Sequence, residues 1–291
     1  MNKGGDFKVL ITGAHGQLGS ELNFLSSLLE GQDFVFTDKD DLDITDPAAI
    51  SNFLTRGKFT AVINCAAYTA VDKAESEKEI AFKINGDAAG NLAKACKQTG
   101  ARFVHVSTDF IFDGTLSRPL LENDLVNPLS VYGASKLDGE KQALVGNPDT
   151  LLLRTSWVYS SFGNNFVKTI LRLCRERESL NVIYDQIGSP TYARDLAGFI
   201  LKAITNKEWK PGIYNYSNEG VASWYDFALA IRDLAGLKTT ILPIETSQYP
   251  TPAARPKYSV LNKRKIKDAY NITIPYWRDS LKGCMELLSG K

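Results

Sequence analysis

The chain has 291 residues, of which 44% are hydrophobic and 23% charged, a balance ordinary for a globular protein. Its formal net charge of +1 gives no electrostatic reason to expect a nucleic-acid or membrane partner. The four cysteines show no metal-ligand spacing, and two histidines are too few for a histidine-rich metal site. Polar residues 1–8 lead directly into an apolar run, so we expect no signal peptide, no membrane span and a cytoplasmic location.

A glycine-rich turn separates the first predicted strand from the first predicted helix. Residues Phe7 to Thr12 form an apolar run that is typical of a buried strand. Gly13, Gly16 and Gly19 follow it, and leucines then recur at helical spacing. Glycines at this position let backbone amides approach a pyrophosphate at a helix N-terminus. The combination of strand, glycines and helix predicts a dinucleotide site.

The second predicted strand, Phe34 to Thr37, ends in two charged residues that bear on the choice of cofactor. Asp38 stands about twenty residues after the glycines, where an acid would hold a ribose hydroxyl of NADH. Lys39 could instead accept the 2′-phosphate of NADPH, so both cofactors stay open. Asp43 and Ile44 follow where the chain could pass the adenine.

Strands and helices alternate through the first half of the chain. Further strands are predicted at Ala61 to Asn64, at Arg102 to Val106 and at Leu151 to Leu153, with one long helix spanning Ala81 to Ala95. This alternation predicts an α/β fold of the Rossmann type, a doubly wound parallel sheet covered on both faces. Thr108 and Asp109 emerge at the carboxyl end of a central strand, where ligands bind in such sheets.

Tyr132 and Lys136 stand four residues apart at the start of a predicted helix, and therefore on one face of it. A phenol has an ordinary pKa of about 10, and a neighbouring ammonium group would lower it. The spacing alone is also that of a solvated pair on a helix surface, so its meaning depends on the rest of the chain.

The second half is less regular and contains a proline-rich loop at Tyr249 to Pro256. We expect residues 1–157 to form an NAD(P)-binding Rossmann domain, with a returning segment at about 181–222. Residues at about 158–180 and 223–291 are expected to form a smaller C-terminal substrate-binding lobe.

Nine stretches together carry a resemblance to known proteins. They are Gly13 to Gly19, Cys65 to Asp72, Ser107 to Asp109, Tyr132 to Lys136, Arg154 to Tyr159, Gly163 to Phe166, Asp185 to Tyr192, Ser223-Trp224 and Tyr249 to Pro256. In this order they resemble the extended short-chain dehydrogenase/reductase superfamily and, within it, the dTDP-4-dehydrorhamnose reductase family. The resemblance covers almost the whole chain.

The resemblance implies hydride transfer from NADPH or NADH to C4 of dTDP-4-dehydro-β-L-rhamnose, the last step of dTDP-L-rhamnose biosynthesis. Tyr132 would donate the proton, Lys136 would tune the phenol and hold the nicotinamide ribose, and Thr108 would hydrogen-bond the carbonyl oxygen. The implied cofactor-binding residues are Gly13, Gly16, Gln17, Leu18, Gly19, Asp38, Lys39, Asp43, Ile44, Ala67, Tyr68, Thr69, Tyr132 and Lys136. The implied substrate-binding residues are Thr108, Asp109, Tyr132, Trp157, Asn165 and Arg255. The resemblance further implies a possible homodimer, with Mg²⁺ at its interface in some relatives.

Phe110 departs from the family pattern, which usually has tyrosine after Ser-Thr-Asp. Dehydratases of the superfamily need an Asp-Glu pair at Asp109 and the next residue, and Phe110 supplies no such carboxylate. A reductase that gives the talose epimer stays open, because facial selectivity depends on the pose of the sugar. A non-catalytic subunit resembling the β subunit of methionine adenosyltransferase is a further alternative, disfavoured by the intact Thr108, Tyr132 and Lys136.

Overall fold

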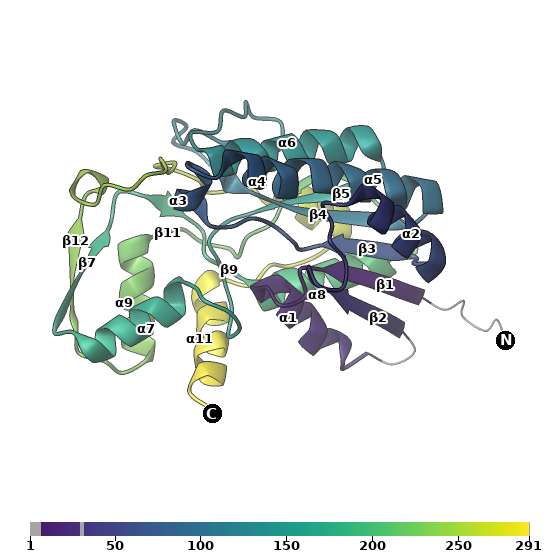
Figure 1. The fold of residues 1–291 in the computed structure, drawn as a ribbon. Coiled ribbons are helices and arrows are strands. Elements are labelled where there is room, and N and C mark those ends of the chain that lie inside the picture. The colour runs from purple at the N-terminus through teal and green to yellow at the C-terminus, as the bar shows by residue number, and fades with distance from the viewer. Residues whose placement is uncertain (1–6, 30–31, 291) are drawn as a thin grey trace.

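Figure 1 shows the computed structural model, which describes residues 7–29 and 32–290. Residues 1–6, which contributed to the expectation that no signal peptide is present, lie outside the described part. Among the described residues, no helix combines the length and the apolar character that crossing a membrane requires.

A six-stranded parallel sheet forms the centre of the larger part of the molecule. Its strands, in spatial order, are β2 (Gln32–Thr37), β1 (Phe7–Thr12), β3 (Ala61–Asn64), β4 (Arg102–Thr108), β5 (Thr150–Thr155) and β10 (Gly212–Asn215). After β2, which lies at one edge, the chain crosses over β1 and forms β3 on its other side. The crevice for a ligand therefore opens at the carboxyl ends of β1 and β3, where the strand order reverses. The predicted α/β fold with a Rossmann-type parallel sheet is confirmed.

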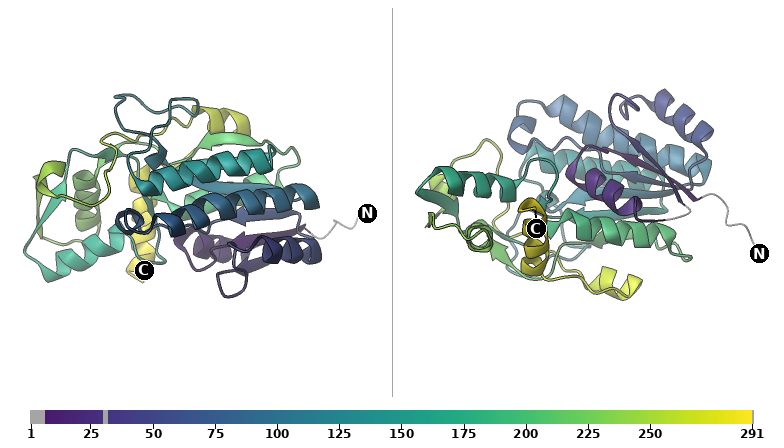
Figure 2. Two further views of the ribbon diagram at one scale, coloured as in Figure 1. Left: turned by 45° about the horizontal axis from the view of Figure 1, so that its top comes forward. Right: turned by 90° about the horizontal axis from the view of Figure 1, so that it is seen from below.

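Helices cover both faces of this sheet (Figures 1 and 2). One face carries α1 (Gln17–Ser26), α8 (Ala193–Thr205) and α10 (Arg264–Tyr270), and the other carries α2 (Pro47–Gly57), α5 (Ala88–Thr99) and α6 (Val131–Gly146). Successive side chains of a strand point to opposite faces. Accordingly Val9 and Ile11 of β1 pack in the first layer, and Leu10 between them packs in the second.

The helix predicted from Ala81 to Ala95 is interrupted. The chain forms α3 (Val71–Ala74), α4 (Lys78–Phe82), a π-helical turn η1 (Lys83–Asp87) and only then α5. The π turn places Asn85 in the interior, where its side chain accepts from the Tyr68 amide at 2.8 Å and donates to the Ser135 hydroxyl at 3.0 Å. A π turn of this kind often lies at a functional site. Here it ties the chain after β3 to α6.

A second group of elements packs beside the carboxyl edge of the sheet (Figure 1). The helices are α7 (Phe166–Glu176), α9 (Trp224–Leu234) and α11 (Trp277–Leu288), and the strands β7 (Ser179–Ile183) and β12 (Thr240–Ile244) form a parallel pair. Its shorter elements are β6 (Val158–Tyr159), β8 (Ile187–Gly188), β9 (Thr191–Tyr192), β11 (Ala222–Ser223) and η3 (Thr246–Gln248), whereas η2 (Asp109–Ile111) follows β4 and packs on α6. This group has its own apolar core around Phe227 and Leu281. We call it the outer lobe.

The outer lobe and the sheet exchange several segments of the second half. Strand β7 belongs to the outer lobe, whereas α8 and β10, which follow it, return to the sheet, and α10 packs near β10. The expected domain boundaries stay a prediction.

Candidate active site

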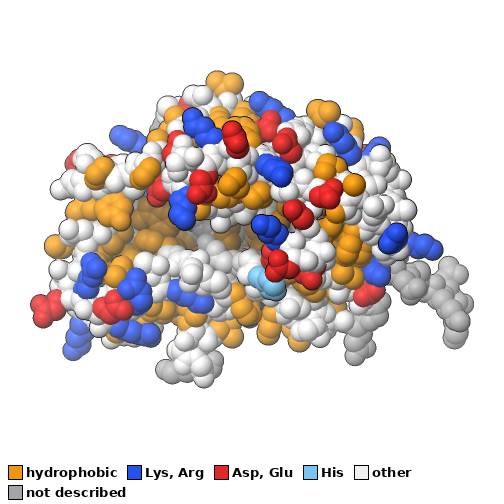
Figure 3. Space-filling model, in the orientation of Figure 1, with side chains coloured by type: hydrophobic (Ala, Val, Ile, Leu, Met, Phe, Trp, Pro, Cys, Tyr) orange, Lys and Arg blue, Asp and Glu red, His pale blue; other side chains and the backbone are white. Residues whose placement is uncertain are grey.

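A cavity of about 1050 Å³ lies at the carboxyl edge of the sheet, facing the outer lobe. Figure 3 shows this face of the molecule hollowed between the two parts. Most residues predicted for cofactor and substrate line the cavity: Gly13, Gly16, Gln17, Leu18, Asp38, Lys39, Asp43, Ile44, Ala67, Thr69, Thr108, Asp109, Tyr132, Lys136, Trp157 and Arg255. Three predicted residues, Gly19, Tyr68 and Asn165, do not line it.

The glycine turn forms the floor of the cavity between β1 and α1. Gly13 has a φ of +69°, and a side chain there would come within 2.6 Å of the Ala66 nitrogen. A Cβ atom at Gly19 would collide with the Gly13 carbonyl oxygen. The absence of a side chain at Gly19 therefore allows α1 to pack closely on the glycine turn. Gly16 precedes α1, and no side chain caps that helix, so its first amide groups are free to bind an anion.

Asp38 and Lys39 lie together at the end of β2, on the cavity wall. Asp38 accepts hydrogen bonds from the backbone amides of His15, at 3.1 Å, and Lys39, at 2.9 Å. Asp43 accepts from the backbone and side chain of Thr45, which lowers the pKa of its carboxyl group. A carboxylate and a cation thus both face the ribose end of the predicted cofactor site.

Tyr68 and Asn165 have structural partners instead of a place in the cavity. The Tyr68 hydroxyl donates to Glu77 at 2.5 Å. The Asn165 side chain caps α7 by accepting from the Lys168 amide at 3.1 Å, and it donates to Gln17 Oε1 at 3.0 Å. Asn165 thereby holds a residue of the glycine turn against the outer lobe.

Tyr132 and Lys136 lie in the first turns of α6, which begins after Ser130 caps it. Lys136 is buried, and its Nζ donates to the Val106 carbonyl oxygen at 2.7 Å. Burial lowers the pKa of the Lys136 ammonium to about 8. The carboxylate of Glu140, one turn further along α6, raises the pKa of Lys136 and so opposes the effect of burial.

The expected lowering of the Tyr132 pKa by Lys136 is not found. Burial raises the pKa of the phenol to about 12, and a hydrogen bond with Thr108 opposes this only in part. Desolvation penalises the phenolate more than the neighbouring groups favour it. The phenol consequently keeps its proton throughout the neutral range, as a proton donor must.

Asp109 follows Thr108 at the end of β4 and is 1% exposed. Its Oδ1 accepts from the Thr108 hydroxyl at 3.1 Å, while Oδ2 has no hydrogen-bond partner among the described residues. Burial raises the pKa of the carboxyl group to about 6, although the nearby Ser259 and Thr108 hydroxyls lower it.

Trp157 adopts an unusual backbone conformation on the cavity wall. Its φ is +47°, in a region that bulky residues rarely adopt. The indole stacks on Trp224, with 3.6 Å between ring centroids and 6° between planes, and a side chain at Gly188 would come within 2.6 Å of it. Such a conformation persists only where the surroundings enforce it.

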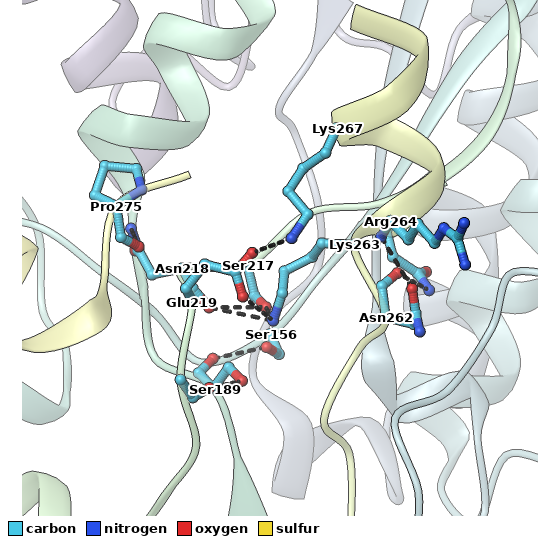
Figure 4. Close-up of polar contacts among 12 residues, drawn as sticks. Ser156, Ser189, Ser217, Asn218, Glu219, Asn262, Lys263, Arg264, Lys267 and Pro275 are labelled. Atoms are coloured by element: carbon cyan, nitrogen blue, oxygen red, sulfur yellow. Dashed lines mark hydrogen bonds and ion pairs between the residues drawn. The ribbon is translucent and has the colours of Figure 1, made fainter. Parts of the chain in front are cut away.

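Polar contacts that begin at Ser156, the residue before Trp157, supply part of that support (Figure 4). The Ser156 hydroxyl donates to the Ser189 carbonyl oxygen at 2.8 Å, and the Ser189 hydroxyl donates to the Gly220 carbonyl oxygen at 2.7 Å. Next to Gly220, Glu219 pairs with Lys267 at 2.7 Å and with the buried Lys263 at 3.6 Å. The network ties the segment before Trp157 to the chain that precedes α9.

A second, mostly apolar groove of about 360 Å³ adjoins the first cavity. Phe110, Trp157, Trp224 and Arg255 line both. Arg255 is the one charged side chain among the described residues that line the groove, and it pairs with Asp72 at 2.9 Å.

Three residues at the site, Trp224, Asp72 and Lys83, are not among the predicted site residues. Lys83 lines the first cavity and lowers the pKa of Asp43. The Ser-Trp match at residues 223–224 was the one available signal for Trp224. For magnesium, the described residues contain no group of three or more His, Cys, Asp or Glu side chains able to hold a metal ion.

The carboxyl edge of the parallel sheet, the glycine turn and the tyrosine–lysine pair all meet in one cavity. This arrangement defines an NAD(P)-dependent reductase of the short-chain dehydrogenase/reductase class. The family model described as the RmlD substrate binding domain matches residues 7–289. The chain therefore belongs to that family.

Its relatives agree over nearly the full length. A dTDP-4-dehydrorhamnose reductase of Burkholderia thailandensis is 41% identical, over 97% of this chain and 99% of its own. The crystal structure of a dTDP-4-dehydrorhamnose reductase from Clostridium acetobutylicum is 42% identical, with a TM-score of 0.93 over 97% of this chain and 99% of that one. That of the Bacillus anthracis enzyme, in complex with NADP, is 39% identical, with a TM-score of 0.92 over the same shares.

Proposed function

We propose that this chain reduces the C4 ketone of dTDP-4-dehydro-β-L-rhamnose to give dTDP-L-rhamnose, the last step of dTDP-L-rhamnose biosynthesis. The observation that carries the proposal is the meeting of Thr108, Tyr132 and Lys136 in the cavity that also contains the glycine turn. The names of the relatives supply the substrate.

The glycine turn fits a dinucleotide because its amides are open and its glycines exclude side chains from the approach. Gly13, Gly16, Gln17 and Leu18 would hold the pyrophosphate, and Asp38 and Lys39 the adenosine ribose. The reduced nicotinamide supplies the hydride when bound. NADP in the Bacillus anthracis relative favours NADPH, and Lys39 is the residue that would bind its 2′-phosphate.

Three side chains of the chain itself handle the carbonyl oxygen. Tyr132 donates the proton that forms the product hydroxyl, and its raised pKa keeps that proton in place until hydride transfer makes the oxygen strongly basic. Thr108 donates a second hydrogen bond to the same oxygen, and the Lys136 ammonium stabilises the phenolate that Tyr132 becomes. Positioned acid catalysis of this kind contributes roughly a hundred- to ten-thousand-fold.

The adjoining groove offers a place for the nucleotide part of the substrate. Its aromatic and aliphatic walls suit a base, and Arg255 stands at the junction with the first cavity, where the diphosphate would pass. Trp157 and Asp109 would contact the sugar ring.

Absorbance of the reduced nicotinamide tests the proposal directly. The protein is mixed with dTDP-4-dehydro-β-L-rhamnose and either NADPH or NADH, and we expect oxidation with at least one cofactor. Binding of cofactor without oxidation by either would favour the non-catalytic alternative. A talose-type product would show that the chain is a reductase, but that hydride reaches the opposite face of the C4 ketone.

Three further expectations belong with this proposal. A cytoplasmic location is supported by four free cysteines, three of them buried, which suit a reducing compartment. The homodimer stays a prediction that sedimentation would test, and the magnesium ion one that metal analysis would test.

A further inference from the structure

The hydroxyl of Thr108 has only one proton to give. Its oxygen lies 3.1 Å from Asp109 Oδ1 and also accepts from the Phe110 amide at 3.3 Å. An ionised carboxylate can only accept hydrogen bonds, so an ionised Asp109 draws the Thr108 proton to itself. Thr108 then has no proton left for the ketone oxygen of a substrate.

A protonated Asp109 reverses this bond. The carboxylic acid donates to the Thr108 oxygen. The O–H bond of Thr108 can then point into the cavity, which both residues line. The direction of the bond between Thr108 and Asp109 therefore decides whether the threonine proton is available on the cavity side, where Tyr132 also hydrogen-bonds Thr108.

Burial stabilises the protonated form of Asp109 relative to that of an exposed carboxyl group, although the Ser259 and Thr108 hydroxyls act in the opposite direction. The side chain is 1% exposed and its Oδ2 lacks a hydrogen-bond partner among the described residues. The titratable side chains on the cavity wall around it are Tyr132 and Lys136 from α6, Cys65 after β3, and Arg255 from the proline-rich loop. None of them forms an ion pair with Asp109, because Arg255 is bound to Asp72 and Lys136 to the Val106 carbonyl oxygen.

We propose that Asp109 is a positioning residue whose own proton turns the Thr108 hydroxyl toward the C4 ketone oxygen of the substrate. The proposal rests on the reductase function above. Asp109 keeps its proton throughout: the hydride goes to C4, Tyr132 supplies the proton that reaches the oxygen, and Thr108 stabilises the developing charge as a donor. The raised pKa of the carboxyl group, about 6, supports this use because it brings the switch into the physiological range.

The pH dependence of kcat/KM tests the proposal, since it reports the ionisation of essential groups in the free enzyme. The cofactor is NADH, because the 2′-phosphate of NADPH itself titrates near pH 6. Between pH 5 and 7.5 the Lys136 ammonium, with a pKa of about 8, stays largely charged. The wild-type kcat/KM should fall by about tenfold for each pH unit above the Asp109 pKa, down to the residual activity of the ionised form.

Two variants separate this role from sugar binding or folding. In Asp109→Asn no ionisable group is left at this position, so kcat/KM should be flat across this range, whatever its absolute value. In Thr108→Val, activity should be about a hundredfold lower, as for a lost oxyanion donor, and also flat. NADH fluorescence establishes that each variant is folded and binds cofactor.

The proposal is overturned if the wild type shows no decline, or if the decline persists with the same midpoint in either variant. Should Asp109→Asn fail to fold, Thr108→Val decides alone. Absence of any reduction by the wild type at every pH with NADPH as well as NADH would instead refute the reductase function, so the two failures are distinguishable.

Discussion

The buried pair of Arg154 and Glu140 should be the main ionic support of the catalytic helix. Glu140 lies one turn beyond Lys136 on α6, and Arg154 lies at the end of β5. The two side chains are 3–4% exposed and are joined by a contact of 2.8 Å. Glu140 also accepts from the Ser107 hydroxyl at 2.6 Å. The pair thus fixes α6 against the two strands whose ends form the site.

Replacing Arg154 with methionine leaves the Glu140 carboxylate buried without its counter-charge. Breaking a buried pair in this way costs about 3–5 kcal/mol of unfolding free energy. With an unfolding entropy of about 2.1 cal/mol/K per residue, the melting temperature should fall by about 5–8 °C. Urea unfolding and calorimetry measure both quantities.

Arg172→Met provides the matched control. Arg172 pairs with Glu176 at the same 2.8 Å, but both side chains are more than half exposed, and such pairs contribute only about 0–1 kcal/mol. The double variant Arg154→Met with Glu140→Leu should recover much of the loss, because neither charge of the pair is left buried without the other. If Arg154→Met and Arg172→Met prove equally mild, the proposed role of burial in this pair is refuted.

Three further predictions concern the site. Tyr132→Phe should lower kcat by about a hundred- to ten-thousand-fold while the Kd for NADH stays within about twofold, and near-normal turnover would remove Tyr132 from the mechanism. Gly19→Ala should weaken NADPH binding and lower the melting temperature, because its Cβ meets the Gly13 carbonyl oxygen. The control is Gly283→Ala in α11, where open space surrounds the glycine, and it should leave the melting temperature unchanged or raise it. An equal fall in melting temperature for both variants would contradict the role of the close contact at Gly19. The Lys136 ammonium loses its charge as pH rises through about 8, so NADH affinity should fall between pH 7 and 9.5, and Lys136→Met should show no such fall.

Periodicity and glycine placement predicted most of the sheet. The strands at Phe7 to Thr12 and Ala61 to Asn64 occur as expected, because a buried parallel strand is a short apolar run with few alternative readings. The helix around Asn85 was predicted as continuous, because a π turn leaves the apolar spacing on either side almost unchanged. Only its partners, Tyr68 and Ser135, show why it is there.

Much of the site depends on contacts that sequence spacing does not contain. The Arg255–Asp72 pair joins residues 183 positions apart, and the positive φ of Trp157 occurs where its indole packs on Trp224. The pKa of Tyr132 was predicted in the wrong direction because a four-residue spacing indicates proximity to Lys136 but says nothing of burial.

Transfer of deuterium tests the central claim most directly. The protein is incubated with dTDP-4-dehydro-β-L-rhamnose and NADPH or NADH deuterated at the transferable C4 position, and the product is examined by NMR. We expect dTDP-L-rhamnose with one deuterium at its C4 carbon for each reduced nicotinamide consumed. Unchanged ketosugar with both cofactors, or a reduced product without deuterium at C4, would contradict that claim.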